Sequence, residues 1–164
     1  MKSNVKSLTL SALMAALICV LTIFPHIPIP AGSGYVHLGD GVILLAVMLL
    51  GPLAIPAAAI GSMLADLMVF PLYAPVTLVV KALVALTAWL VYRRGSMART
   101  IAAFLLAELV MVAGYFVYEW FTVPEYAVVD ILGNLIQGAA GVALGLLFSA
   151  LLPRLERTLR RARI

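Results

Sequence analysis

The chain has 164 residues, of which 65% are apolar and 11% charged, and its mean hydropathy is +1.15. Soluble domains are about 45–50% apolar and about 25% charged, so this composition excludes a water-soluble globule, and its high apolar content excludes a disordered chain. The single cysteine, Cys19, excludes a disulfide framework and a cysteine-based zinc site. The sequence therefore predicts one integral membrane domain over residues 1–164, with room for about six crossings.

Six apolar segments, separated by polar residues or by Pro and Gly, predict an all-α integral membrane protein. The expected helices cover about residues 5–24, 40–50, 53–70, 76–92, 99–118 and 130–152, with a basic tail at 153–164. The second helix is short, because about eleven residues cover only about 16 Å of a hydrocarbon core about 30 Å thick. The alternative is five helices, with residues 41–70 as one proline-kinked helix.

The distribution of positive charge distinguishes these alternatives. With six helices and both termini cytoplasmic, the inner segments hold ten of the eleven cations and the outer loops none; the eleventh, Lys81, lies within a helix. The five-helix alternative leaves two cations inside and eight outside, against the positive-inside rule. Six crossings are therefore favoured, and the basic tail is an orientation signal that contacts lipid, not nucleic acid. The ten inner cations are Lys2, Lys6, Arg93, Arg94, Arg99, Arg154, Arg157, Arg160, Arg161 and Arg163.

The first apolar segment is expected to be a retained helix. Lys2 and Lys6 precede it as they precede a signal peptide, but its apolar run of 17 residues is longer than the usual ~7–15, and no A-x-A cleavage site follows.

Small residues recur at four-residue spacing in the first and last helices, which lets helices approach closely in lipid. The first helix carries the pairs Ala12/Ala16 and Ser11/Ala15, and the last carries Gly141/Gly145. Such pairs serve either packing within the chain or the docking of a second membrane subunit.

The first outer loop, residues 25–39, has three prolines, three glycines and no Lys or Arg. It is either a stiff connector or a lid over a binding pocket. Tyr35, His37 and Asp40 lie at its end. Asp40 either caps the second helix or faces a pocket, and His37 alternatively is an interfacial side chain. Two candidate ligands do not make a tetrahedral metal site, so no metal is expected.

Charged residues inside predicted spans are costly, at about 2.5–3.5 kcal/mol or more, and indicate functional sites. Asp66 near the outer end of the third helix and Lys81 near the outer end of the fourth lie at similar depths of ~6 and ~9 Å. They are expected to meet, either as a neutralising ion pair or as ligand-binding groups. Glu108 lies near the midplane and either is a protonated, hydrogen-bonded acid or lines the floor of a cavity.

The last helix presents Asp130, Asn134 and Gln137 at positions i, i+4 and i+7, so the three side chains form one stripe descending ~10 Å from the outer surface. The two carboxamides either hydrogen-bond another helix or bind a ligand such as a nitrogen heterocycle.

Aromatic residues gather on the same outer side. They form either an interfacial belt or, in part, a stacking surface for a planar ligand. Together with the polar groups they predict an extracellular-side pocket and not an open pore, since no ring of like charges or filter motif is present. The residues are Phe70, Tyr73, Tyr115, Tyr118, Trp120, Phe121 and Tyr126.

Taken together, these features resemble the substrate-binding S components of energy-coupling factor (ECF) vitamin transporters, in the riboflavin-type branch that includes hydroxymethylpyrimidine and pyridoxine carriers. The resemblance covers nearly the whole chain. It rests on the helix pattern, the Ala12/Ala16 pair and the segments GYVHLGD at 34–40, GPLAIPAAAIGSMLADL at 51–67, VKALVAL at 80–86 and NLIQGAAG at 134–141.

The resemblance implies a subunit of a prokaryotic cytoplasmic membrane that binds a vitamin outside. It implies docking through Ala12 and Ala16 onto a transmembrane T component driven by two ABC-type ATPases. Loop 1 with Tyr35, His37 and Asp40 would close the pocket, and Lys81, Asn134 and Gln137 would contact the ligand. A small hydroxylated pyrimidine or pyridine is favoured, and riboflavin is the larger alternative. No cofactor is implied, and no Walker motif is present.

Two other function classes compete with this interpretation. A stand-alone proton-coupled carrier or small channel would use Asp66 and Glu108 as protonation sites. A membrane-embedded enzyme would use His37, Asp40 and Asp66, but no nucleophile–base pair or complete ligand set can be assembled from the sequence. We therefore expect a binding subunit without catalytic residues.

Overall fold

The computed structural model describes residues 2–25, 27–28 and 35–162, with the backbone alone for residues 2–4 and 155–162. Gly34 of the loop motif and Arg163 of the basic tail lie outside the described residues. The elements are α1 (Lys2–Ile23), β1 (Ile27–Pro28), β2 (Tyr35–Val36), α2 (Gly39–Leu50), the 3₁₀ turn η1 (Gly51–Leu53), α3 (Ala54–Val69), α4 (Ala74–Val91), α5 (Met97–Thr122) and α6 (Pro124–Ala162).

The helices α2 and α3 run in opposite directions along α1. The Leu38 amide, just before α2, donates to the Leu21 carbonyl at 3.1 Å, whereas Ser11 Oγ donates to the Leu53 carbonyl, just before α3, at 3.0 Å. Gly51 makes the reversal with a φ of 59°, a conformation that other residues rarely adopt. Residues 41–70 therefore form two helices joined by a 3₁₀ turn and not one continuous kinked helix.

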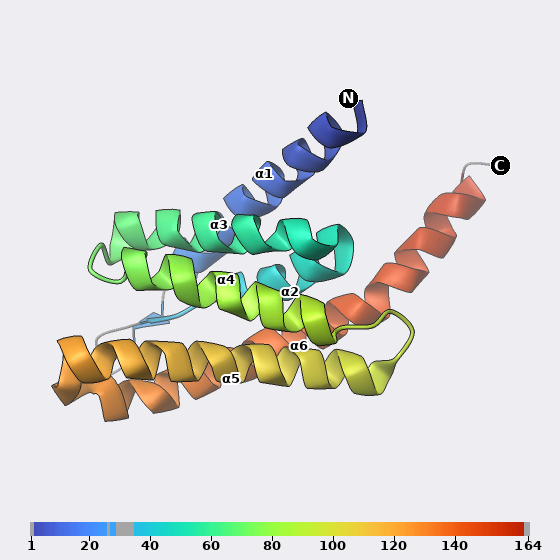
Figure 1. The fold of residues 1–164 in the computed structure, drawn as a ribbon. Helices are drawn as coiled ribbons and strands as arrows, with labels where there is room; N and C mark the ends of the chain where they lie inside the picture. Colours follow the sequence, from blue (N-terminus) through green and yellow to red (C-terminus); the bar gives the residue numbers. More distant parts are fainter. Residues whose placement is uncertain (1, 26, 29–34, 163–164) are drawn as a thin grey trace.

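Successive helices run back and forth along the bundle, so both termini lie at the same end (Figure 1). In the described part of the chain, five stretches are long and apolar enough to cross a membrane, and one of them is the α2–η1–α3 stretch Gly39–Val69. The 12 residues of α2 reach only about 18 Å, so α2 is short, as the sequence predicts.

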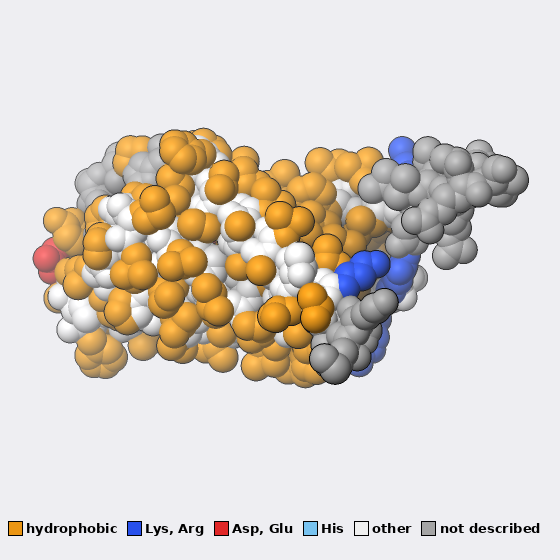
Figure 2. All heavy atoms as spheres, turned by 90° about the horizontal axis from the view of Figure 1, so that it is seen from above, with side chains coloured by type: hydrophobic (Ala, Val, Ile, Leu, Met, Phe, Trp, Pro, Cys, Tyr) orange, Lys and Arg blue, Asp and Glu red, His pale blue; other side chains and the backbone are white. Residues whose placement is uncertain are grey.

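Large apolar side chains cover the outside of the bundle, as Figure 2 shows for one face. Leu8 is 70%, Met68 74% and Phe121 81% exposed, while many buried positions hold alanine. This is the reverse of a soluble protein and suits a lipid environment, where close helix packing depends on small residues.

On the surface shown in Figure 2, acidic and basic side chains lie at opposite ends of the bundle. The "acidic end" holds the α3–α4 and α5–α6 connections with Asp66, Glu119, Glu125 and Asp130, and the "basic end" holds the α4–α5 connection with Arg93, Arg94 and Arg99, together with Arg154.

The two small-residue pairs of α1 have different surroundings. Ser11 and Ala15 pack against α3: Ser11 bonds Leu53, and a Cβ on Gly61 would lie 2.4 Å from the Ala15 carbonyl oxygen. Ala12 and Ala16 are exposed. One pair therefore serves packing within the chain, and the other is left on the surface.

In α6 the glycine spacing serves internal packing. A Cβ on Gly141 would lie 2.8 Å from Glu108 Oε1, and a Cβ on Gly145 would lie 2.8 Å from Leu44 Cδ1. The small residues let α6 approach α5 and α2.

The last two helices are longer than predicted. The sequence prediction ends the fifth helix at residue 118 and begins the sixth at residue 130, but α5 continues to Thr122 and α6 begins at Pro124. Proline is well accommodated in the first turn of a helix because the amide it lacks has no partner there. As a result, Glu119 and Asp130 both lie on helices.

Candidate functional site

A cavity opens at the acidic end among β2, α3, α5, α6 and the α3–α4 turn, and its space is about 420 Å³ including the mouth. Polar and aromatic side chains from segments far apart in the sequence converge on it. The lining residues are Tyr35, His37, Asp66, Phe70, Tyr73, Tyr115, Glu119, Asp130, Asn134 and Gln137.

Five of the seven residues predicted to bind substrate line this cavity: Tyr35, His37, Asp66, Asn134 and Gln137. The other two, Asp40 and Lys81, lie behind the wall, where Asp40 bonds the lining residue Gln137. The polar spacing in α6 and the position of loop 1 thus point to the end of the molecule at which this cavity lies, whereas depth along a helix does not tell a wall residue from one behind the wall.

Asp40 and Lys81 form a buried ion pair. Lys81 Nζ lies 2.6 Å from Asp40 Oδ1, with both side chains 1% exposed. Gln137 Nε2 donates to Asp40 Oδ2 at 2.6 Å. The prediction that Lys81 pairs with Asp66 is therefore wrong. Lys81 pairs with Asp40, because α2 packs against both α4 and α6 and carries Asp40 into the interior.

The alternative in which Asp40 caps α2 is wrong. The N-cap residue is Leu38, without a side-chain cap bond. His37 Nδ1 instead accepts from the Gly39 amide at 3.1 Å, and His37 Nε2 lies 3.2 Å from Gln137 Nε2. His37 is 7% exposed, so it is buried between the start of α2 and α6 and is not an interfacial side chain.

Asp66 is held by hydroxyl groups. Tyr35 Oη donates to Asp66 Oδ1 at 2.6 Å, and Thr77 Oγ1 donates to the other oxygen. Thr77 in turn lies 2.9 Å from Tyr115 Oη. Burial, followed by the nearby Asp66 carboxylate, raises the pKa of Tyr35 above its ordinary value, so its hydroxyl remains a donor at neutral pH. This bond ties β2 of loop 1 to α3 and closes one side of the cavity.

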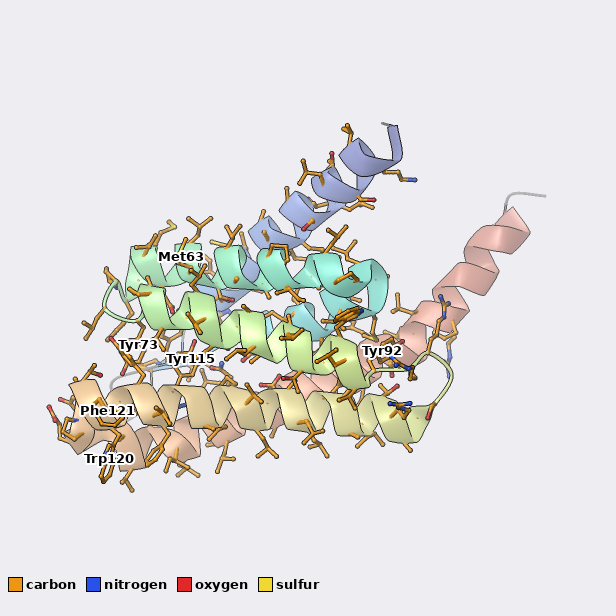
Figure 3. The ribbon with its side chains drawn as sticks, in the orientation of Figure 1. Met63, Tyr73, Tyr92, Tyr115, Trp120 and Phe121 are labelled. Carbon is orange, nitrogen blue, oxygen red and sulfur yellow. The ribbon has the colours of Figure 1, made fainter. Side chains whose placement is uncertain are left out.

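The aromatic residues divide into two groups. Tyr73 and Tyr115 lie close together inside the bundle, with ring centroids 6.2 Å apart, and Phe70 lies 5.7 Å from Tyr73. Trp120 and Phe121 are 53% and 81% exposed and lie away from this pair at the end of α5 (Figure 3). Both sequence alternatives therefore apply: Phe70, Tyr73 and Tyr115 line the cavity, and Trp120 and Phe121 suit an interfacial belt.

Two acidic residues extend the wall beyond the predicted set. Tyr73 Oη donates to Glu119 Oε1 at 3.2 Å. Glu119 is 2% and Asp130 1% exposed, and the two carboxyl groups are electrostatic neighbours. Sequence reasoning includes Asp130 in the polar stripe of α6 but places Glu119 in a loop. Helical spacing is the sequence signal that would have found Glu119. If the helix is continued to residue 122, residues 108, 111, 115 and 119 fall on one face, and this face of α5 is buried.

Glu108 lies deeper, between α5 and α6, facing Gly138 and Gly141. It is 4% exposed, and its two carboxyl oxygens have no hydrogen-bond partner among the residues described. The alternative in which Glu108 is hydrogen-bonded is therefore not realised within this part of the chain. Glu108 does not line the cavity at the acidic end.

Across the segments that the structure describes, no group of three His, Cys, Asp or Glu side chains is arranged to hold a metal ion. What the cavity offers is carboxylates, carboxamides, phenols and one imidazole, which suits the hydrogen bonding of a small polar molecule.

The fold is similar to two solved S components. It superimposes on the S component of a bacterial ECF transporter with a TM-score of 0.74, at 25% identity, covering 95% of this chain and 98% of that one. It superimposes on the S component for biotin from an ECF-type ABC transporter with a TM-score of 0.68, at 20% identity, covering 95% and 93%; this second likeness concerns the fold alone.

A sequence relative is an uncharacterised protein encoded in the gap 3′ region of Pyrococcus woesei, 33% identical over 131 residues, which are 78% of this chain and 88% of the relative. Residues 2–154 match the model of a family described as ECF-type riboflavin transporter, S component. The chain therefore belongs to the S-component family of ECF transporters and is an integral membrane, substrate-binding transporter subunit, not an enzyme.

Proposed function

We propose that this S component captures a small water-soluble vitamin or vitamin precursor from outside the cell, in the cavity at the acidic end. The observation that carries this is the convergence of ten lining residues, five of them in the set predicted from sequence to bind substrate, on one hollow. Convergent polar groups in a largely preformed pocket are typical of small-molecule sites.

The orientation rests on charge. The described arginines of the loops and of α6 lie at the basic end, and cytoplasmic segments of membrane proteins are enriched in Lys and Arg. We therefore place six crossings in a prokaryotic cytoplasmic membrane, with both termini in the cytoplasm and the cavity facing outward.

A small ring suits this cavity better than a large tricyclic ligand. Its enclosed space is only about 40 Å³, far below the range of about 300–1,000 Å³ for pockets that hold drug-sized ligands, so the cavity favours a small ligand. Asn134 and Gln137 supply carboxamides, and Tyr73 and Tyr115 supply ring faces. Hydroxymethylpyrimidine and pyridoxine fit this chemistry, and riboflavin is the larger alternative.

ECF S components work with a T component and ATPases. For this chain we propose one T component and two ABC-type ATPases, with the exposed Ala12 and Ala16 facing the T component. Small exposed residues at four-residue spacing permit close approach of a partner helix.

One observation favours a second candidate, a stand-alone proton-coupled carrier. Glu108 is a buried carboxyl group without a hydrogen-bond partner in the described chain, and such intramembrane acids occur in proton relays. This candidate requires the purified chain alone, in liposomes, to move substrate under a proton gradient without any ATPase subunit.

The test of the main proposal is mass spectrometry of small molecules released from the purified protein, followed by uptake of the released compound in cells that contain or lack the T component and ATPases. We expect a small vitamin or precursor, with uptake only in cells that contain them. Release of no such compound, together with uptake by the isolated chain, would contradict the proposal.

A further inference from the structure

The wall of the cavity at the acidic end is rich in carboxyl groups. It contains three carboxyl groups, Asp66, Glu119 and Asp130, and neither Lys nor Arg is among its lining residues. His37 is the one basic side chain among them, and its Nδ1 accepts a hydrogen bond from the Gly39 amide at 3.1 Å.

The nearest buried cation, Lys81, does not balance these acids. It is paired with Asp40 at 2.6 Å and lies behind the wall, with its Nζ 5.4 Å from the centre of the Tyr115 ring. Lys81 is therefore paired behind the wall, and Glu119 has neither Lys nor Arg beside it among the residues that line the cavity.

Asp66 and Glu119 differ in how many of their carboxyl oxygens accept a hydrogen bond. Asp66 accepts a hydroxyl hydrogen bond on each oxygen. Glu119 accepts one from Tyr73 on Oε1, but its Oε2 is buried without a hydrogen-bond partner among the described residues. A carboxylate buried at 2% exposure beside a second acid is costly unless a cation, a strong donor or a proton shared with that acid, here Asp130, neutralises it.

We infer that the ligand of this S component brings a positively charged nitrogen to Glu119, so that the substrate class is a small heterocycle carrying a protonated amino group. The inference rests on the proposed function and specifies its substrate. Three observations support it: the Oε2 of Glu119, which has no hydrogen-bond partner among the described residues, the absence of Lys and Arg from the described wall, and the faces of Tyr73 and Tyr115, which attract cations.

The charge distribution of the whole chain favours the same ligand. The cavity lies at the acidic end, and a cleft lined by one sign of charge with low-dielectric walls raises the local concentration of ions of opposite sign. A neutral ligand gains nothing from this field, and an anionic ligand is repelled.

The experiment compares matched ligands that differ in one group. Purified full-length protein, freed of bound ligand, is titrated at neutral pH with pyridoxamine against pyridoxine, and with aminomethylpyrimidine against hydroxymethylpyrimidine. An ammonium–carboxylate hydrogen bond in a buried site is worth more than a neutral one, so we expect at least one aminomethyl ligand to bind about tenfold or more tightly than its hydroxymethyl partner.

Variants show whether Glu119 is responsible. Glu119→Gln should remove this preference, Asp130→Asn should reduce it, and Glu125→Gln, at an exposed acid of the same end, should leave it unchanged. The thermal midpoint of each variant reports folding, and the comparison in the wild-type protein does not depend on any variant.

Equal or tighter binding of the hydroxymethyl ligands would overturn the charge inference while leaving the vitamin-binding proposal standing. Failure of both aminomethyl ligands to bind would also overturn it. Failure of the proposed function is seen separately, as uptake of the released compound without the T component and ATPases.

Discussion

Lys81 and Asp40 form an ion pair in the interior of the bundle, at 2.6 Å. Removing the cation leaves a buried carboxylate, so Lys81→Met should lower the free energy of unfolding by about 3–5 kcal/mol. Because Asp40 also accepts from the lining residue Gln137, ligand affinity should fall as well. Thermal unfolding in detergent measures the first effect and ligand titration the second.

The control for this prediction is the double variant Asp40→Asn with Lys81→Met. It replaces the uncompensated carboxylate by a neutral amide and should recover much of the lost stability. If Lys81→Met alone is as stable as the wild type, the ion pair does not hold α2 and α4 together.

Asn134 is 9% exposed and lines the cavity. Asn134→Ala should weaken ligand binding about tenfold, the effect of losing one or two hydrogen bonds, without unfolding the protein. Ser149→Ala is the matched control, since Ser149 lies on the same helix, outside the cavity wall, and its hydroxyl bonds the Leu146 carbonyl. Titration of both variants with the released ligand measures the change in affinity. If Asn134→Ala binds as tightly as the wild type, Asn134 does not contact the ligand.

For single residues, sequence reasoning finds those whose type is unusual for a membrane span. Tyr35, His37, Asp66, Asn134 and Gln137 are recognisable as polar groups at one depth, and all line the cavity. The partner of Lys81 was not predictable, because the choice between Asp40 and Asp66 depends on how α2 packs. Glu119 was missed because its polarity indicates a loop, although it lies on a buried face of α5.

Among the helices, the contact between α1 and α3 depends on Gly61, where an added Cβ would lie 2.4 Å from the backbone oxygen of Ala15. Backbone cannot move aside cheaply, so Gly61→Ala should destabilise the protein by about 1–3 kcal/mol. Gly138→Ala, whose Cβ would meet Glu108 Cβ at 3.1 Å, should cost less. Thermal midpoints compare the two; the reverse order would contradict the tight α1–α3 packing.

The exposed pair of α1 predicts where the T component docks. Ala12→Trp should prevent co-purification with the T component and ATPases while leaving ligand affinity unchanged, because Ala12 is exposed and lies outside the cavity wall. Val117→Trp is the control, at a 55% exposed position of α5. Normal assembly of Ala12→Trp would refute this docking surface.

The helices themselves were largely predictable, because apolar segments with Pro and Gly breaks mark them. The α2–α3 reversal was inferred from loop charge and agrees with the positive φ of Gly51. The end of α5 and the start of α6 were missed, because polar residues between 119 and 130 suggest a loop, although they continue the helices around the cavity. The two-residue ladder pairing Ile27 with Val36 has no alternating pattern long enough to detect.

The whole molecule is a bundle with a basic end and an acidic end, and its only strongly polar interior lies toward the latter among the residues described. This polarity joins the two parts of the proposal, in which Lys and Arg set the orientation in the membrane and the opposite end receives substrate. Composition and loop charge predict this arrangement. The shape of the cavity requires the packed structure, because it is built from side chains of five separate segments.

Accessibility of engineered cysteines tests this account most directly. In a Cys19→Ser background, Phe70→Cys places a thiol in the cavity wall at a 36% exposed position, and Arg154→Cys places one at the basic end. In intact cells, a membrane-impermeant thiol reagent should label Phe70→Cys, the released ligand should protect it, and Arg154→Cys should react only after permeabilisation. Labelling of Arg154→Cys in intact cells, or no protection of Phe70→Cys by ligand, would contradict an outward-facing substrate site at the acidic end.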